Sequence, residues 1–155
     1  MHTTKQNHAA DFGLFLIRAV LAAVFFYHGS QKLFGWFGGH GLEATAQWMG
    51  SIGIPFPRLN ALLASVTEVA GAVVLLMGTG TRLAAVPMAF TMAVAIATVH
   101  NSGFDVRTGG MEYALTLGVV LVALVLTGPG EFTLGRLFGG KLPKFAAAGT
   151  VRTAS

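Results

Sequence analysis

The sequence contains no cysteine among its 155 residues. This absence excludes disulfides, thiol redox relays, and thiolate-ligated zinc or iron–sulfur sites built from this chain alone. Charged residues are also scarce, at 10% of the chain, against roughly 25% in an ordinary soluble domain. Although the formal net charge is +4, no run of basic residues could follow a phosphate backbone, so nucleic acid is not an expected partner.

Apolar side chains are abundant instead. Hydrophobic residues make up 54% of the chain and the mean hydropathy is +0.67, more than a soluble core requires. Apolar runs that are typical of membrane-spanning helices recur along the sequence. They cover residues 12–27, 59–77, 83–99 and 111–126. We therefore predict an all-α integral membrane four-helix bundle that forms one domain over residues 1–155, with flexible tails at 1–10 and 140–155.

The lysines and arginines outside the predicted spans indicate how the bundle is oriented. Four spans place both termini on one side of the membrane, and most of these basic residues fall on that side. Cytoplasmic segments carry the excess of lysine and arginine, so we expect both termini in the cytoplasm. The terminal side holds Lys5, Arg82, Arg136, Lys141, Lys144 and Arg152, and the other side holds Lys32, Arg58 and Arg107.

A long glycine-rich and aromatic loop connects the first two predicted spans, over residues 29–58. Loops of this length are often functional. We expect a short helix at residues 42–49 to lie in the membrane interface, with Trp36, Phe37 and Trp48 forming an aromatic belt. The glycines lack the preceding strand and the lysine–serine pair of a phosphate-binding loop.

Two charges interrupt the first two spans. Arg18 lies about ten residues before the outer end of the first span, and Glu68 lies about nine residues after the outer start of the second. At the rise of an α-helix, the two reach nearly the same depth. A charge in hydrocarbon is costly and is usually paired inside the bundle, so we predict an ion pair between Arg18 and Glu68. Such a pair would either fix the helix register or take part in function.

A second group of polar residues falls at the outer ends of the spans. In a four-helix bundle these ends meet on one side of the membrane, so the side chains should converge. They could bind and protonate a quinone headgroup, because histidine exchanges protons near neutral pH. The members of this candidate ligand pocket are Tyr27, His28, Lys32, His100, Glu112 and Tyr113.

Four of these residues also have a simpler interpretation that stays open. The histidines could be interfacial residues bonded to backbone carbonyls or water, and Lys32 could snorkel toward lipid headgroups. Glu112 also favours a helix start through its charge. Because the sequence has no HxxxH or ExxH spacing, we predict neither a metal nor a haem cofactor. The sequence assigns no catalytic residue.

Several short motifs follow one another along the chain. The first span carries R-x9-HG-x2-KL-x-G from Arg18, the second carries E-x2-G from Glu68, and LLMGTGTR follows and ends at Arg82. Later pieces are H-x3-F from His100, G-x-EY from Gly110 and TGPG from Thr127. In order and spacing, the chain resembles the DoxX family of small four-helix bacterial inner-membrane proteins over roughly residues 12–138.

The resemblance implies a multi-pass inner-membrane protein. The family is named after a membrane component associated with thiosulfate:quinone oxidoreductase. The resemblance therefore implies a small membrane subunit of a quinone-linked system for sulfur, thiosulfate or oxidative-stress chemistry. Without cysteine, electron transfer would require a quinone, another cofactor or a redox partner protein. The alternatives are a non-catalytic scaffold for such a partner, or a small lipid-binding or transport protein, which would need to form a homo-oligomer. The matching polar positions are Arg18, His28, Lys32, Glu68, Arg82, His100, Glu112 and Tyr113.

Overall fold

The computed structural model describes residues 8–137, which form helices joined by turns and short irregular segments. The elements are α1 (His8–Phe34), α2 (Gly41–Ser51), α3 (Pro57–Met77), α4 (Thr81–Thr98), the 3-10 helix η1 (Val106–Thr108), α5 (Glu112–Thr127) and α6 (Leu134–Leu137). The all-α class predicted from the sequence is confirmed for this part of the chain.

Three helices, α1, α3 and α4, are long and apolar enough to cross a membrane. The apolar run predicted as a fourth span forms the helix α5, which has only 16 residues and is not among these three. At 1.5 Å per residue, α5 is about 24 Å long, which is short of a hydrocarbon core of about 30 Å. Length and composition therefore mark three spans in the described residues, and α5 is a shorter apolar helix beside them.

The first helix is longer than the sequence predicted. It begins at His8, so residues 8–10 belong to its first turn and not to a tail, and it continues to Phe34. The other residues of the predicted tails, 1–7 and 140–155, lie outside the described part of the chain. The helix expected within the long loop is present as α2.

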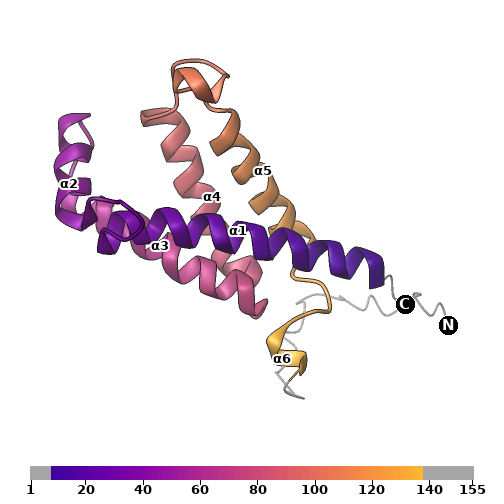
Figure 1. Ribbon diagram of the computed structural model, residues 1–155. Helices are drawn as coiled ribbons and strands as arrows, with labels where there is room; N and C mark the ends of the chain where they lie inside the picture. Colours follow the sequence, from indigo (N-terminus) through magenta and orange to yellow (C-terminus); the bar gives the residue numbers. More distant parts are fainter. Residues whose placement is uncertain (1–7, 138–155) are drawn as a thin grey trace, which may run out of the picture.

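The long helices pair as two hairpins (Figure 1). In one hairpin α1 lies along α3, and in the other α4 lies along α5. The short helix α2 packs against α3 and α1 at the end of that pair remote from His8. In Figure 1 the hairpin of α4 and α5 leans away from α1 and α3, so the two hairpins cross instead of standing parallel.

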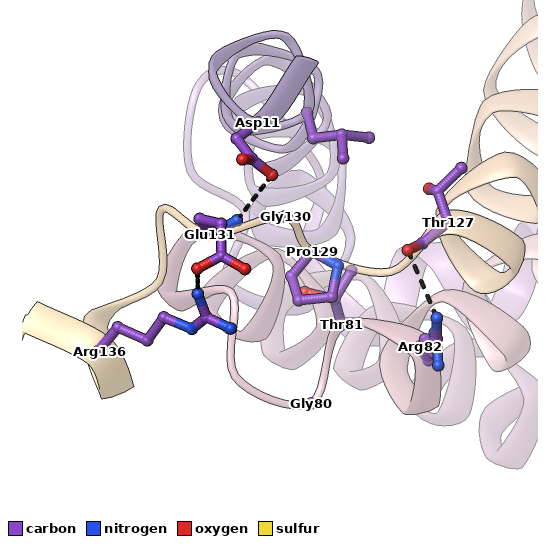
Figure 2. A pocket seen from close by; sticks show the side chains of 10 residues that line it. Asp11, Gly80, Thr81, Arg82, Thr127, Pro129, Gly130, Glu131 and Arg136 are labelled. Atoms are coloured by element: carbon purple, nitrogen blue, oxygen red, sulfur yellow. Dashed lines mark hydrogen bonds and ion pairs between the residues drawn. The ribbon is translucent and has the colours of Figure 1, made fainter. Parts of the chain in front are cut away.

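Polar contacts close the end of the molecule where α1 begins (Figure 2). The Asp11 side chain accepts a hydrogen bond of 3.1 Å from the backbone N–H of Glu131, and Glu131 is also ion-paired with Arg136. Arg82 donates to the carbonyl of Thr127 at 3.4 Å. These residues surround a cavity of about 520 Å³. The charged groups around this cavity therefore bond to one another or to the backbone, and these bonds stabilise this end of the molecule.

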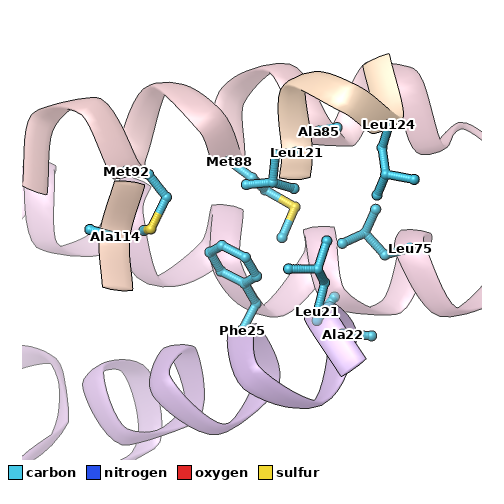
Figure 3. Close-up of a cluster of buried hydrophobic side chains, with 11 residues drawn as sticks. Leu21, Ala22, Phe25, Leu75, Ala85, Met88, Met92, Ala114, Leu121 and Leu124 are labelled. Atoms are coloured by element: carbon cyan, nitrogen blue, oxygen red, sulfur yellow. The ribbon is translucent and has the colours of Figure 1, made fainter. Parts of the chain in front are cut away.

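The buried apolar core lies where the two hairpins meet (Figure 3). Leu21 and Phe25 of α1 and Leu75 of α3 pack against Met88 of α4 and Leu121 of α5. Lipid tails are as apolar as these side chains, so close van der Waals packing is what favours helix association in a membrane.

Glycines allow the helices to approach closely. A Cβ on Gly29 of α1 would lie 2.8 Å from the Cβ of Glu68 on α3, and one on Gly71 of α3 would overlap the Met88 side chain of α4. Small residues at helix contacts are a common means of close packing in membranes.

Candidate functional site

The larger cavity lies between the two hairpins, near the end of α1 and α3 where α2 packs. Its volume is about 820 Å³, which is within the range of small-molecule sites. Its wall is built by α1, α2, residues 52–55, α3, α4 and α5. Most of the wall is apolar and includes Phe25, Leu63, Phe90 and Val94. The cavity is therefore suited to an organic molecule with an apolar body.

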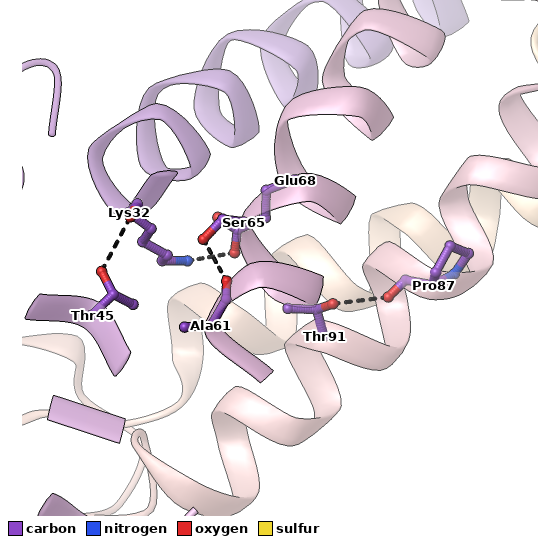
Figure 4. Close-up of polar contacts among 7 residues, drawn as sticks. All are labelled: Lys32, Thr45, Ala61, Ser65, Glu68, Pro87 and Thr91. Carbon is purple, nitrogen blue, oxygen red and sulfur yellow. Dashed lines mark hydrogen bonds and ion pairs between the residues drawn. The ribbon is translucent and has the colours of Figure 1, made fainter. Parts of the chain in front are cut away.

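An ion pair forms one part of this wall. The Nζ atom of Lys32 on α1 donates to Oε1 of Glu68 on α3 at 2.5 Å (Figure 4). Glu68 is 1% exposed, whereas the Lys32 side chain remains 34% exposed. Lys32 therefore reaches from the more open part of the wall to a carboxylate held deep between the helices. Gly29, one turn before Lys32, permits this approach of α1 to α3.

Two histidines and a tyrosine also belong to the polar part of the wall. His28 and Tyr113 bring α1 and α5 together, with their ring centroids 6.4 Å apart in an edge-to-face arrangement. His100 follows the end of α4, where its backbone N–H donates to the Ala95 carbonyl at 2.9 Å. Four of the six residues of the predicted ligand pocket, His28, Lys32, His100 and Tyr113, line this one cavity.

The other two predicted pocket residues lie elsewhere. The Tyr27 ring stacks on Phe37 at a centroid distance of 5.1 Å and is not part of the cavity wall. Glu112 is the first residue of α5, and its backbone N–H donates to the Phe104 carbonyl at 2.9 Å, outside the wall.

The predicted ion pair between Arg18 and Glu68 is wrong. Arg18 is 0% exposed and donates from Nη1 to the Leu75 carbonyl at 3.1 Å and from Nη2 to the Phe132 carbonyl. Glu68 is paired with Lys32 instead. The buried guanidinium is therefore balanced by backbone carbonyls near the negative end of α3, and not by a carboxylate.

The error lies in the assumed register of the two helices. The prediction set His28 level with residue 59, but the structure places Gly29 against Glu68 and Gly78 against Arg18. The difference is about nine residues, or roughly 14 Å along a helix. It arises because α1 continues to Phe34 before the chain turns, so the start of α3 extends well past His28.

Some wall residues were not identified from the sequence. Asn60 and Thr67 are seven residues apart on α3, and both lie on the face of the helix that lines the cavity. Their spacing of two helical turns was a readable signal. Trp48 was assigned to an aromatic belt, and Thr91 of α4 carried no sequence signal. The hydroxyl of Thr91 bonds to the Pro87 carbonyl at 3.0 Å, so its polar atom is already engaged.

Metal-ligating side chains do not gather in the described region. Within residues 8–137, no group of three or more histidine, aspartate or glutamate residues could hold a metal ion. The cavity wall offers an ammonium, imidazoles, a phenol and a carboxylate beside a long apolar surface. These groups fit the headgroup and tail of an amphipathic organic ligand.

The loop between α4 and α5 has its own charged contact. Arg107 donates from Nη2 to Oδ2 of Asp105 at 2.9 Å, and its backbone N–H donates to Oδ1 at 2.9 Å. The side-chain bond and then the backbone bond to Arg107 lower the pKa of the Asp105 carboxyl, and the same contact raises the pKa of Arg107. This pair orders the segment that leads from His100 to Tyr113.

Together, the long apolar helices and the mostly apolar cavity with its polar groups define an integral membrane protein with a candidate ligand site. The chain belongs to the DoxX family, because the DoxX family model matches residues 13–101. The family and its inner-membrane relatives make it a multi-pass protein of the bacterial inner membrane.

Two relatives are similar over most of their length. CatD of Bacillus subtilis, whose name assigns it provisionally to the oxidoreductases, is 31% identical over 119 residues, 77% of this chain and 83% of CatD. The inner membrane protein YphA of Escherichia coli is 30% identical over 138 residues, 81% of this chain and 94% of YphA. No solved structure matches the chain.

Proposed function

We propose that this DoxX protein is a small membrane subunit of a quinone-linked redox system, and that the quinone headgroup binds in the larger cavity. The observation that carries the proposal is the presence of His28, Lys32, His100 and Tyr113 in the wall of one mostly apolar cavity. The name of the relative CatD supports a redox role for the family members.

The chemistry of the wall suits a quinone. A quinone offers two carbonyl acceptors and an apolar tail. The ammonium of Lys32 and the phenol of Tyr113 can donate to the carbonyls, and the imidazoles can exchange protons with the headgroup. The tail would lie along Leu63 and Phe90. A quinone supplies redox chemistry when bound, and the residues of this chain bind it, orient it and exchange protons.

Electrons would have to come from another protein. The chain has no cysteine to carry them, so a redox partner at the membrane surface would supply or accept them. In this role the protein is one subunit of a larger system. Sulfur, thiosulfate or oxidative-stress chemistry would then belong to the partner.

The proposed topology is a single membrane domain with α5 as a fourth span and both termini in the cytoplasm. The start of α1, the α3–α4 turn and the end of α5 all meet at the smaller cavity, so the larger cavity belongs to the other end. In this topology the quinone headgroup would lie at the outer side of the membrane. The excess of lysine and arginine at the terminal side supports the orientation.

Purification in mild detergent tests the function. Extraction and mass spectrometry of the purified protein should reveal a copurifying quinone. Tyr113→Phe and His28→Ala should each lower the quinone content about fivefold, the effect of losing one hydrogen bond of about 1 kcal/mol. Tyr27→Phe is the matched control, because Tyr27 lies outside the wall, and should leave the content unchanged. A scaffold predicts a different result. The folded protein would then contain no quinone, and cutting the α1–α3 connection would release a bound partner.

A further inference from the structure

Glu68 has one carboxylate oxygen that receives no hydrogen bond. Its Oε1 accepts from Lys32, whereas its Oε2 is buried and has no hydrogen-bond partner among the described residues. A buried polar atom without a partner costs considerable free energy, and more so on a charged group. The site is therefore complete only when a further donor, from water or from a ligand, reaches this oxygen.

A donor can approach Glu68 from the side of the larger cavity. On the α1 side, Gly29 packs against the base of the side chain, where an added Cβ would lie 2.8 Å from the Cβ of Glu68. On α3 itself, the nearby hydroxyl of Ser65 donates to the Ala61 carbonyl at 2.6 Å, so it is engaged elsewhere (Figure 4). Glu68 is a wall residue of the larger cavity.

The oxidation state of a bound quinone decides whether it can serve this oxygen. A quinone presents only carbonyl acceptors, whereas a hydroquinone has O–H donors and keeps oxygen lone pairs. Only a hydroquinone can donate to Glu68 while it accepts from Lys32 or Tyr113. We infer that the cavity binds the hydroquinone in preference to the quinone, with Glu68 Oε2 accepting a hydrogen bond from a ligand hydroxyl. This inference rests on the proposed quinone site.

Three ligands with the same ring and the same tail separate hydrogen bonding from tail binding. They are a benzoquinone with a decyl tail, its hydroquinone, and the dimethyl ether of that hydroquinone, which has no O–H group. Binding is measured without oxygen, in detergent, by quenching of Trp48, which stands in the cavity wall. Trp36→Phe removes the second of the two tryptophans. The hydroquinone should bind at least about tenfold more tightly than either other ligand, because only it gives Glu68 a donor.

Glu68→Gln tests the residue. Its amide N–H₂ can donate to a quinone carbonyl, so the preference for the hydroquinone should fall to about onefold or reverse. Glu112→Gln is the matched control: it makes the same exchange outside the cavity wall, so the preference should stay. If Glu68→Gln does not fold, the three ligands on the unsubstituted protein still decide.

The possible failures are distinguishable. Equal binding of quinone and hydroquinone, or of hydroquinone and its dimethyl ether, would overturn the role of Glu68 and leave the quinone site in place. The same holds if Glu68→Gln keeps the full preference. No binding of any of the three ligands, with only phospholipid in the purified protein, would overturn both this inference and the proposed function.

Discussion

The guanidinium of Arg18 occupies the space that a side chain on Gly78 would need. Gly78 ends α3 with a left-handed φ of +77°, and a Cβ built there would overlap Arg18. The buried cation thus lies directly at the carbonyl end of α3, where the helix dipole is negative. One glycine satisfies both the turn between α3 and α4 and the placement of the charge.

Gly78→Ala should therefore be strongly destabilising. An alanine in the left-handed region costs about 1–2 kcal/mol, and displacing Arg18 from its carbonyls adds to this, for a total of about 3 kcal/mol or more. Gly38→Ala is the matched control, because Gly38 has the same φ of +77° but nothing within 4 Å of the added Cβ. Unfolding in detergent, followed by circular dichroism, compares the two. Equal losses would show that backbone strain alone is responsible.

Replacing Lys32 by methionine should destabilise the protein by about 2–4 kcal/mol, because it leaves the buried carboxylate of Glu68 without its cation. The double variant with Glu68→Met should recover most of this loss, since no charge then remains buried. The exposed pair of Arg58 and Glu43, at 3.7 Å, is the comparison. Arg58→Gln should cost less than about 1 kcal/mol. A Lys32→Met loss no larger than this would contradict a structural role for the ion pair.

Two glycines of α1 should respond in opposite directions to alanine. Gly29→Ala places a methyl 2.8 Å from the Cβ of Glu68 and 3.0 Å from the backbone nitrogen of Val69, so it should push α1 from α3 and destabilise the protein. Gly13→Ala meets nothing within 4 Å and should stabilise the helix by up to about 1 kcal/mol. The midpoint of unfolding in increasing dodecyl sulfate measures both. If the two variants shift the midpoint in the same direction, the close approach at Gly29 is not tight.

The loop contact of Asp105 predicts a local dependence on pH. Bonds from the Arg107 side chain and backbone lower the pKa of Asp105 from its ordinary value of 3.8. The ionised carboxylate therefore stabilises the loop above that ordinary value, and the contribution is lost as the pH falls through the lower pKa of the folded state. An NMR titration of the Arg107 amide should show a midpoint below 3.8. Arg107→Gln should raise the midpoint, and Asp105→Asn should abolish the titration.

Sequence patterns predicted the helices better than their register. The apolar runs at residues 59–77 and 83–99 closely match α3 and α4, because run length and composition are local properties. The partner of Arg18 was missed because the residues of α3 that lie at the depth of Arg18 depend on where the chain turns. The turn comes late, since α1 continues to Phe34. A backbone carbonyl as the counter-group leaves no trace in residue identity.

The polar pocket could be predicted only in part for the same reason. His28, Lys32, His100 and Tyr113 lie in the same wall because each is near the end of a helix that reaches the same region. Tyr27, next to His28, turns toward Phe37, because neighbouring residues on a helix point about 100° apart. The direction of a side chain around its helix axis was the missing information.

The unequal lengths of the helices have a consequence for the surrounding lipid. With 27 residues, α1 is about 40 Å long and exceeds the thickness of a typical hydrocarbon layer, whereas α5 falls short of it. A helix whose apolar stretch is too long tilts, whereas the bilayer thins around one that is too short. With α5 as the proposed fourth span, the bilayer should thin beside the α4–α5 hairpin, and the protein should partition differently between bilayers made of short and long acyl chains.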